Sequence, residues 1–528
     1  MADPLLQRFA HLVQRSPESP LVTDGYRTMN RGEVAALGCR VADQLGQLPG
    51  TDSEAAGPEN AVLRPEAHTL AALRAPNGAA FLAGWLALRH LGAAVLPLEG
   101  GGTARAQALG ARGVLECEER WPRGPEDFRW RPLRRRGEAE ARLPEAVEAV
   151  KLTSGSTGVA RGVMVTSAAL IADDQAGVES MGLVDEDRIL TVVPMGHSYG
   201  LACVTVPALS RGCTLLLPPE DGGPLAAWAA AERLEASFLP TAPAYVRALV
   251  ELADPPPLAP SLRLVITSGA PMDPVTARRF RQRYGRSVHV LYGASECGGV
   301  CFDRDGRGGE EGSVGGAMEG IAIALEPAPD GVGDLVAVSG PALALGYLEP
   351  AADGGAAPSG DRRLVPGRFR SSDLGRFQGC RLELLGRSDD LINIRGKKVY
   401  PREVESVLLR LEGVEEAVAL GVERSGGGQL VRAVVACRPG TLRDEEVRRH
   451  CREHLAQHKV PRSLVLVERL PRTPRGKIDR AALRAPGLGS TGSPRMESPK
   501  AESPGLKSTT LGSAPLAAPR GVPGANES

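Results

Sequence analysis

The chain has 528 residues, and its 63 basic and 63 acidic side chains give a formal net charge of zero. This length exceeds what one hydrophobic core usually serves, so two or more domains are expected, and a hydrophobic content of 42% is ordinary for a globular protein. Balanced charge gives no sign of nucleic-acid binding, since the short basic run Arg134–Arg136 is followed directly by acidic residues.

The N-terminal segment and the cysteines indicate where the protein works. Met1–Ser16 carries Asp3 and has no long apolar stretch, so it does not resemble a signal peptide. The most apolar segments, such as Leu201–Leu209, are far shorter than the roughly 20 residues of a membrane span. The nine cysteines form no Cys-x-x-Cys pair, and Cys297 with Cys301 cannot supply four zinc ligands. We therefore expect a cytoplasmic protein with reduced cysteines.

The first 385 residues alternate strand-like and helix-like segments. A helix predicted at Ala79–Leu91 precedes a strand at Ala93–Leu96, and a strand at Leu262–Ile266 precedes a helix at Pro274–Tyr284. This alternation predicts an α/β fold of layered, largely parallel sheets covered by helices. Irregular loops are expected at Gly100–Arg105 and in the Gly/Pro/Ala-rich segment 350–366.

The pattern changes after Asp389 and Asp390. The expected elements are a helix at 399–411, strands at 415–422 and 430–437, a helix at 444–457 and a strand at 463–467. They predict a small α+β domain. We place the domains at 1–385 and 386–485, and the Ser/Pro-rich segment 486–528 is predicted to be a disordered tail. Its Ser-Pro steps at Ser493, Ser498 and Ser503 suit phosphorylation or tethering.

The strongest local motif is Lys151–Gly162, which begins like a strand and continues as Thr-Ser-Gly-Ser-Thr-Gly-Val-Ala-Arg-Gly. Glycines let backbone amides approach a polyanion, the hydroxyls add donors, and Arg161 adds positive charge. The segment is not a Walker A loop, because no G-x-x-x-x-G-K-[ST] frame fits it. Taken alone, the motif is equally consistent with a flexible turn.

Further motifs follow in a fixed order. Tyr292–Glu296 comes directly after the apolar strand Val288–Leu291. A flat ring, a hydroxyl and a carboxylate at the end of a strand suit a nucleotide and its magnesium. Arg370–Gly375 then offers Asp373 to a pair of ribose hydroxyls. The remaining charged motifs are Gly386–Asp390, Ile394–Glu405 and Leu470–Arg480. Each motif alone could be a turn or a solvated charge run, but together they indicate one nucleotide-handling enzyme.

With these motifs in this order, the chain resembles the adenylate-forming superfamily of acyl-CoA synthetases, luciferases and peptide-synthetase adenylation domains. The resemblance covers roughly Leu5–Leu483 and is strongest to the AMP-forming acyl-CoA synthetases. It implies a large N-terminal domain that binds ATP and the acid, and a small mobile C-terminal domain. The activity it implies is an AMP-forming acid–thiol ligase. A fatty, branched or aryl acid reacts with ATP to give acyl-AMP and pyrophosphate, and the acyl group passes to coenzyme A.

The resemblance assigns roles to matching positions. The phosphate-binding positions are Thr153, Ser154, Gly155, Ser156, Thr157 and Gly158, with Arg161. The adenine-side positions are Ser268, Gly269, Ala270 and Pro271, together with Tyr292, which would stack on the base, and its neighbour Gly293. Ser295 would bind the α-phosphate, Glu296 would bind Mg²⁺, Asp373 and Arg387 would hold the ribose, and His197 would border the acyl pocket.

By the same resemblance, Lys477 would stand between the carboxylate of the acid and the α-phosphate. Attack of one anion on another requires the two to be held at about 3 Å, and a cation between them cancels their repulsion. No general base is required, because the acid is already ionised near neutral pH. The resemblance also implies that the small domain rotates about Asp389 and brings the loop around Gly396 towards the pantetheine channel.

At three positions the sequence departs from the usual motifs of the family. Arg161 follows Ala160 where Pro-Lys is common, Ser295 replaces threonine, and Ser372 replaces the glycine before Asp373. Arg161 keeps the positive charge, Ser295 keeps the hydroxyl, and Ser372 could shift the backbone beside Asp373. None of the three removes a charge that the chemistry needs, so altered kinetics are expected rather than loss of activity.

The sequence leaves several alternatives open. Coenzyme A is the first choice of acceptor, and the phosphopantetheine of a carrier protein is the second. Amino-acid activation is disfavoured, because the segment from His197 to Ala202 contains no aspartate to bind an α-ammonium group. A non-catalytic nucleotide-binding scaffold is expected to lack Lys477, Glu296 and Asp373, yet all three are present. Nothing in the sequence favours a luciferase-like oxygenase.

Overall fold

The computed structural model of the protein describes residues 3–48, 63–99, 102–133, 141–153, 161–220, 223–252, 256–328, 333–351, 355–359, 361, 363–394, 396–424, 428–472 and 478–485. Met1–Ala485 forms one compact unit, and the predicted tail 486–528 lies outside the described residues. Within the described ranges, no helix has the length and apolar character of a membrane-spanning segment.

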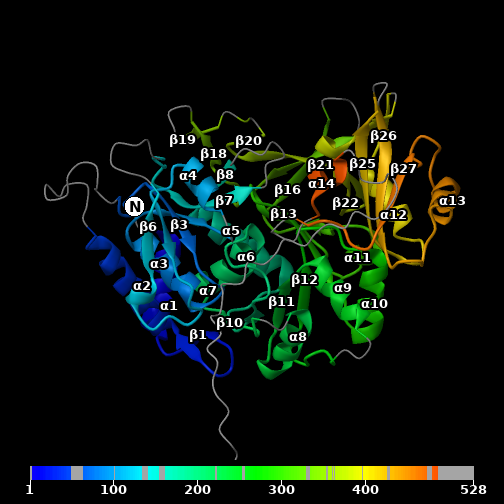
Figure 1. The fold of residues 1–528 in the computed structure, drawn as a ribbon. Coiled ribbons are helices and arrows are strands. Elements are labelled where there is room, and N and C mark those ends of the chain that lie inside the picture. Colours follow the sequence, from blue (N-terminus) through cyan, green and yellow to red (C-terminus); the bar gives the residue numbers. More distant parts are fainter. Residues whose placement is uncertain are drawn as a thin grey trace, which may run out of the picture. The chain divides into compact units, whose positions relative to one another are not determined.

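The largest sheet has nine strands among the described residues, in the order β15-β14-β13-β12-β11-β9-β10-β1-β2. Figure 1 labels β13, β12, β11, β10 and β1 of this sheet. From the β15 edge the nine strands are Gly316–Ala317, Gly298–Phe302, His289–Ala294, Leu264–Thr267, Phe238–Thr241, Arg188–Leu190, Thr214–Leu216, Pro20–Thr23 and Thr28–Asn30. The strands from β13 to β1 pair in parallel, and the edge strands pair antiparallel. Parallel neighbours require crossover connections, and the helices that occur along this part of the chain are α8 (Gly223–Arg233), α9 (Pro243–Glu251) and α10 (Pro274–Tyr284).

The second sheet has eight described strands in the order β19-β18-β8-β7-β4-β3-β5-β6. In that order they are Ala356–Pro358, Gly346–Pro350, Arg161–Thr166, Val147–Thr153, Ala94–Pro97, Leu70–Arg74, Gly113–Glu116 and Arg129–Pro132. Successive side chains of a strand point to opposite faces, so Leu70 and Ala72 of β3 join one core while Ala71 and Leu73 join another. The sheet is therefore buried on both sides, which fixes the end of β7 where the predicted phosphate segment begins.

Helix α5 (Ser167–Met181) contacts β14 of the first sheet and β7 and β8 of the second (Figure 1). It begins where Thr166 Oγ1 accepts the N–H of Ala169 at 3.0 Å, and it ends at Gly182, which has a left-handed backbone. The other helices of the first 385 residues are Pro4–Arg15 (α1), Arg31–Gly46 (α2), Ala79–His90 (α3), Thr103–Ala108 (α4), Ser198–Gly200 (α6), Val206–Ser210 (α7), Gly223–Arg233 (α8), Pro243–Glu251 (α9), Pro274–Tyr284 (α10) and Gly308–Glu311 (α11). A π-helix at Leu201–Thr205 joins α6 to α7, and Pro125–Asp127 is a 3₁₀ turn.

A third sheet has five described strands and is antiparallel throughout. Its strands are β16 (Ala322–Pro327), β17 (Asp334–Ser339), β20 (Leu364–Val365), β21 (Arg368–Gln378) and β22 (Arg381–Arg387). The predicted α/β fold with a large sheet-rich N-terminal domain is confirmed, and parallel pairing occupies the centres of the two larger sheets. The third sheet differs because too few residues separate β16 from β17, and β21 from β22, for the crossover connection that parallel pairing requires.

The C-terminal elements form the smaller α+β domain. They are β23 (Ile392–Ile394), β24 (Lys397–Val399), α12 (Pro401–Leu408), β25 (Val414–Glu423), β26 (Gln429–Cys437), α13 (Asp444–His454), β27 (Ser463–Val467) and α14 (Arg480–Arg484). Strands β25 and β26 are antiparallel, and β26 and β27 are parallel. Their apolar side chains share one core with α12 and α13.

Several predicted boundaries were wrong. The helix predicted from Val399 begins at Pro401, because proline suits the first turn of a helix and keeps the preceding residue extended. Residues Thr103–Ala108 form a helix where an irregular loop was predicted up to Arg105. The predicted loop 350–366 contains two short strands, β19 and β20, and it places Asp361 between them.

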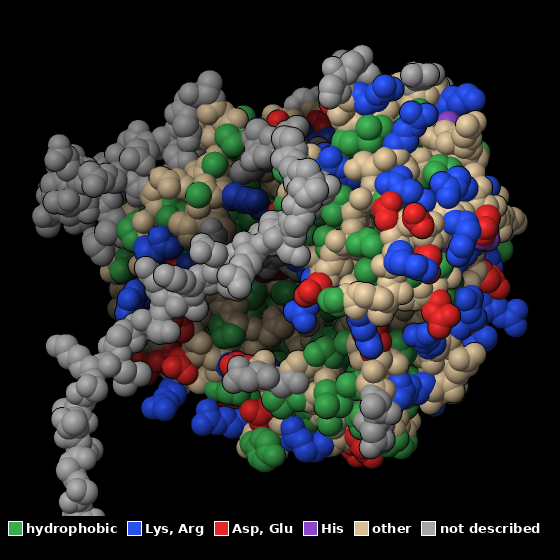
Figure 2. Space-filling view, turned by 45° about the vertical axis from the view of Figure 1, so that its right-hand side comes forward, with side chains coloured by type: hydrophobic (Ala, Val, Ile, Leu, Met, Phe, Trp, Pro, Cys, Tyr) green, Lys and Arg blue, Asp and Glu red, His purple; other side chains and the backbone are tan. Residues whose placement is uncertain are grey.

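Charge on the surface is mixed in sign. On the face shown in Figure 2, acidic and basic side chains are interspersed. Exposed ion pairs such as Arg376–Glu383 and Arg448–Asp444 show this mixing at single contacts. The pattern agrees with the zero net charge of the chain.

Candidate active site

The predicted phosphate segment is anchored at both ends. Thr153 ends β7, Arg161 begins β8, and the two are cross-strand partners. Thr153 Oγ1 also donates a hydrogen bond to the carbonyl oxygen of Arg161 at 3.4 Å. The predicted phosphate-binding residues Ser154, Gly155, Ser156, Thr157 and Gly158 lie outside the described residues.

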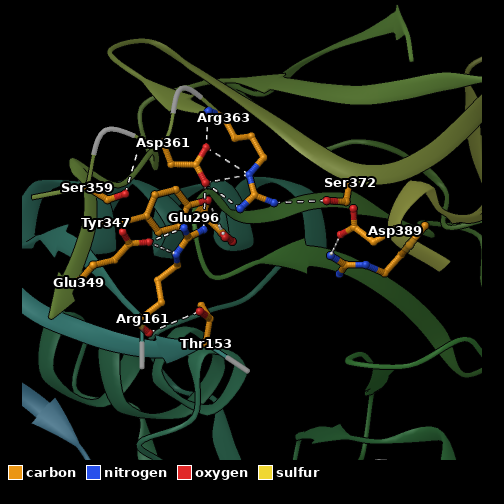
Figure 3. Close-up of polar contacts among 11 residues, drawn as sticks. Thr153, Arg161, Glu296, Tyr347, Glu349, Ser359, Asp361, Arg363, Ser372 and Asp389 are labelled. Atoms are coloured by element: carbon orange, nitrogen blue, oxygen red, sulfur yellow. Dashed lines mark hydrogen bonds and ion pairs between the residues drawn. The ribbon is translucent and has the colours of Figure 1, made fainter. Parts of the chain in front are cut away.

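The Arg161 side chain contacts two carboxylates (Figure 3). Its Nε donates to Glu349 at 2.6 Å, and its Nη1 donates to Asp361 at 2.9 Å. Its guanidinium also lies over the Tyr347 ring, 4.5 Å from the ring centre, in a cation–π arrangement. The charge of Arg161 is thus balanced by the protein in this structure, and its contact with phosphate stays a prediction.

Tyr347 links this cluster to Glu296. Strand β18 carries Tyr347 and pairs with β8, so the tyrosine lies opposite Val163. The buried Tyr347 hydroxyl donates to Glu296 Oε1 at 3.0 Å, and Glu296 itself is partly exposed (Figure 3). Burial, and then the charge of Glu296, raise the pKa of Tyr347, so the hydroxyl remains a donor at physiological pH.

Asp361 extends the network towards the predicted ribose site. Arg363 donates its Nη2 to Asp361 at 2.7 Å and its Nη1 to Ser372 Oγ at 3.5 Å (Figure 3). Burial acts to raise the pKa of Asp361, but hydrogen bonds from Arg363 and Arg161 prevail and lower it to about 2. Asp361 is therefore a permanent anion between two arginines.

The predicted base and ribose residues meet directly. Tyr292, near the end of β13, donates its hydroxyl to Asp373 Oδ2 at 2.7 Å. Asp373 on β21 is the cross-strand partner of Arg387 on β22. The guanidinium of Arg387 donates to Asp389 at 3.4 Å. Four residues predicted from three separate motifs thus form one connected group.

The histidine segment reaches the same region. Ser198 and Ser295 share a hydrogen bond of 2.7 Å between their hydroxyl oxygens. His197 precedes Ser198, and its Nδ1 accepts the N–H of Tyr199 at 3.4 Å. The turn admits no added side chain, since a Cβ at Gly200 would lie 1.9 Å from the carbonyl oxygen of Pro194.

The adenine-side segment lies at the neighbouring strand end. Ser268 follows β12, and its N–H donates to the carbonyl oxygen of Thr241 at 3.2 Å. Strand β12 pairs in parallel with β13, so Ser268, directly after β12, and Tyr292, near the end of β13, lie at the same edge of the sheet. Gly269, Ala270 and Pro271 are exposed, and Gly269 has a φ of +84° with open space where a Cβ would stand. Gly293 is also exposed.

The C-terminal candidates occupy turns. Gly396 has a φ of +86°, and its N–H donates to Asn393 Oδ1 at 2.8 Å in the hairpin between β23 and β24. Asp389 is exposed and lies in the 3₁₀ turn Ser388–Asp390, whose other two residues are partly buried. Lys477 lies outside the described residues, but the chain on either side of it is paired through a bridge between Arg472 and Ile478.

The sequence did not single out five residues of this cluster, namely Ser198, Tyr347, Glu349, Asp361 and Arg363. Ser198 stood next to the predicted His197 and offered a hydroxyl as its signal. The contacts of Arg161 with Glu349 and Asp361 span 188 and 200 positions of sequence, so a local sequence pattern cannot predict them.

Comparison with known proteins identifies the family. The AMP-binding enzyme model matches residues 110–348, and the AMP-binding enzyme C-terminal domain matches residues 403–477. The chain is 31% identical over 355 residues to a methyl-dioxo-octahydro-indenyl-propanoyl:CoA ligase of Mycobacterium tuberculosis, covering 66% of this chain and 68% of that protein. It is 29% identical over 524 residues to the nonribosomal peptide synthetase CymA of Salinispora arenicola, covering 91% of this chain and 6% of that protein.

A solved structure shares the fold. The o-succinylbenzoate CoA synthetase of Bacillus subtilis, in complex with an acyl-adenylate intermediate, superposes with a TM-score of 0.74 at 22% identity, covering 92% of this chain and 99% of that one. The matched models, the relatives and this fold agree with the motifs of the sequence. The chain therefore belongs to the AMP-binding enzymes, the adenylate-forming family that its motifs resemble.

Proposed function

We propose that the protein is an AMP-forming acid–thiol ligase, an acyl-CoA synthetase that joins a carboxylic acid to AMP and then to coenzyme A. The observation that carries this proposal is the contact of 2.7 Å between the Tyr292 hydroxyl and Asp373. The sequence assigned these two residues separately to the base and the ribose of one nucleotide. Their contact across 81 positions supports a single nucleotide site. The relative named as a CoA ligase supports the acceptor.

In the first half-reaction, the carboxylate oxygen forms a bond to the α-phosphorus of ATP, and the bond to pyrophosphate breaks. The acid would lie where the histidine turn meets Ser295, because Ser198 and Ser295 are in contact there. The hydroxyl of Ser295 would donate to the α-phosphate. Lys477 would stand between the two anions and follow the negative charge into the transition state.

Mg²⁺ fits the donors that this site offers. Glu296 presents a partly exposed carboxylate whose Oε1 accepts the Tyr347 hydroxyl. Among the described residues, no cluster of three or more His, Cys, Asp and Glu side chains forms a metal cage. Mg²⁺ is commonly held by one or two carboxylates together with substrate phosphates, so Glu296 would be its ligand from this chain. When bound, the ion would neutralise phosphate charge.

In the second half-reaction, the sulfur of a thiol would form a bond to the acyl carbon of acyl-AMP, the bond between that carbon and the phosphate oxygen would break, and AMP and the thiol proton would be released. We propose that this half-reaction follows a movement of the small domain, residues 386–485, about a hinge at Asp389. The exposed position of Asp389 in the 3₁₀ turn Ser388–Asp390 supports a hinge at this point. Gly396 has open space where a Cβ would stand, which suits a segment that passes close to pantetheine.

A second candidate acceptor is the phosphopantetheine of a carrier protein, and the alignment with CymA over 91% of this chain favours it. The test is pyrophosphate release with a panel of acids, with and without coenzyme A or a phosphopantetheinylated carrier protein, followed by mass spectrometry of the thioester. Acyl-CoA formation is expected. Thioester on the carrier alone would replace coenzyme A as acceptor, and release of no pyrophosphate from any acid would refute acid activation.

A further inference from the structure

An ion pair joins the small domain to the large one at a point that the mechanism above does not use. Arg247 is on α9 of the large domain, and Glu416 is on β25 of the small domain. Arg247 Nη1 donates to Glu416 Oε1 at 3.1 Å and to the carbonyl oxygen of Glu415 at 3.1 Å. The strand is therefore held at the helix by two hydrogen bonds, one of which joins opposite charges.

Glu416 also holds the base of the segment that carries Lys477. Its Oε1 accepts a second hydrogen bond, from Arg472 Nη2. Arg472 pairs with Ile478 through an antiparallel bridge, and Lys477 is the residue directly before Ile478. One carboxylate oxygen thus connects Arg247 of the large domain to the base of the Lys477 segment.

Helix α9 begins at the edge of the sheet where the proposed nucleotide site lies. It starts at Pro243, two residues after Thr241 ends β11. The carbonyl oxygen of Thr241 accepts the N–H of Ser268, which belongs to the adenine-side segment. Arg247 is four residues further along the helix than Pro243, which is about 6 Å at 1.5 Å per residue. The link through Glu416 therefore ties the base of the Lys477 segment to a helix that starts at the site.

The contacts beside the proposed hinge come from a different sheet. Arg402 on α12 donates to the carbonyl oxygen of Leu384 on β22 at 2.5 Å. Tyr400 packs against an apolar cluster of the third sheet. These contacts are close in sequence to Asp389, so a rotation about this residue can preserve them. The same rotation would move Glu416 away from α9, which follows a strand of the first sheet.

We propose that Glu416 is a positioning residue for acyl-AMP formation. By bridging Arg247 and Arg472, it holds the small domain where Lys477 can act, and the rotation that admits the thiol separates it from Arg247. This inference rests on the proposed ligase function. Lys477 carries the chemistry, and Glu416 acts only through it. The link is therefore needed in the first half-reaction and is dispensable in the second.

The test measures the two half-reactions separately in the full-length protein. Pyrophosphate exchange with an accepted acid reports acyl-AMP formation, and thioester formation from chemically prepared acyl-AMP and coenzyme A reports acyl transfer. Glu416→Gln keeps the shape of the side chain but removes its charge. It is expected to lower kcat for exchange roughly 3- to 10-fold, the range of one ordinary hydrogen bond, at an unchanged KM for ATP. Acyl transfer is expected to be at least as fast as in the wild type.

Variants of the partner and of a neighbour complete the test. Arg247→Ala is expected to show the same difference between the half-reactions, and Arg247→Lys, which keeps the charge, should recover part of the exchange rate. Glu415→Gln is the matched control, because the Glu415 carboxylate pairs with the exposed Arg438 at 3.2 Å. The control keeps the backbone carbonyl that accepts Arg247 and should react like the wild type in both assays.

Several results would overturn the positioning role. They are an equal loss in both half-reactions, a loss confined to acyl transfer, and wild-type exchange in both Glu416→Gln and Arg247→Ala. A loss in Glu415→Gln equal to that in Glu416→Gln would do the same. Absence of exchange by the wild type with every acid would instead remove the ligase function itself.

Discussion

Arg161 and Asp361 are joined by a hydrogen bond of 2.9 Å across 200 positions of sequence. Arg161 follows the segment predicted to bind phosphate, and Asp361 lies between β19 and β20. Arg363 holds the same carboxylate at 2.7 Å and reaches Ser372, the neighbour of Asp373. The carboxylate therefore connects the two ends of the proposed nucleotide site.

Replacing Asp361 by asparagine is expected to destabilise the protein at neutral pH. The pKa of Asp361 is lowered from 3.8 to about 2, so its ionised form adds stability above about pH 4, and this is lost as the pH falls through about 2. The shift corresponds to an order of 2 kcal/mol. Urea unfolding at pH 7 should show the loss, and the difference from the wild type should shrink in acid. Asp185→Asn, at an exposed aspartate, is the control, and an equal effect there would contradict the assignment.

Tyr347→Phe is expected to weaken magnesium binding at the proposed site without altering the fold. The change removes the hydroxyl that donates to Glu296 at 3.0 Å but keeps the ring under Arg161. A freer Glu296 should raise the Mg²⁺ concentration for half-maximal pyrophosphate release by about 3- to 10-fold, the value of one ordinary hydrogen bond. Tyr245→Phe removes a comparable hydroxyl contact of 2.9 Å to Pro224 and should leave the magnesium titration unchanged. Identical titrations for both variants would exclude the positioning role.

Tyr292 and Asp373 are expected to act as one unit in ATP binding. Tyr292→Phe and Asp373→Asn should each raise the KM for ATP. The free-energy change derived from the KM of the double variant should be smaller than the sum of the changes in the two single variants. Residues in direct contact typically show coupling energies of about 0.5–3 kcal/mol in such cycles. Steady-state kinetics of the four proteins give this value. Simple additivity would mean that the contact of 2.7 Å has no role in nucleotide binding.

Lys477→Ala is expected to reduce acyl-AMP formation by about 10²- to 10³-fold, the usual loss when one donor to a developing charge is removed. ATP binding, followed by calorimetry, should remain measurable. Lys459→Ala serves as the matched control, because Lys459 pairs with Glu403 at 2.6 Å in the same domain and has no proposed role in catalysis. Equal rates of pyrophosphate exchange in wild type and Lys477→Ala would rule out the assignment.

Glu148 is expected to make stability fall as the pH rises. Burial raises the pKa of Glu148 from an ordinary 4.5 to about 7, and the charge of Asp3 adds to this rise while the positive charge of Arg89 opposes it. The contribution of Glu148 to the free energy of unfolding is therefore fully present below about pH 4.5 and is lost as the pH rises through about 7. The glutamine of Glu148→Gln stays neutral and can still accept the Trp85 N–H. The free energy of unfolding of this variant should therefore rise relative to that of the wild type between about pH 5 and pH 8. A pH-independent difference in unfolding free energy would contradict this.

Much of the candidate site could be predicted from the sequence because its motifs are short and local. Tyr292 and Asp373 could be named from the residues around them, and the structure brings them into contact. The partners of Arg161 could not be named, because the pairing of β18 with β8 brings Glu349 to it and Asp361 comes from the segment between β19 and β20. A Gly/Pro/Ala-rich segment such as 350–366 has no apolar period that would indicate its strands.

The fold was predictable where strands alternate with helices and less so elsewhere. Helix Pro274–Tyr284 was predicted with its observed bounds, because Asp273 and Pro274 start it and Gly285 ends it. The antiparallel third sheet was not foreseen, since strand pairing depends on contacts between distant segments. The early start predicted for the helix at Val399 shows that apolar character alone cannot distinguish a strand end from a helix start.

The glycines of the histidine turn constrain how this enzyme can diversify. A side chain at Gly200 would collide with Pro194, and one at Gly196 would lie 2.6 Å from Pro97 Cβ. Evolution or directed mutagenesis therefore has little freedom within the turn itself. Substitutions just beyond the turn have more room, because Ala202 and Cys203 border a cavity of about 20 Å³.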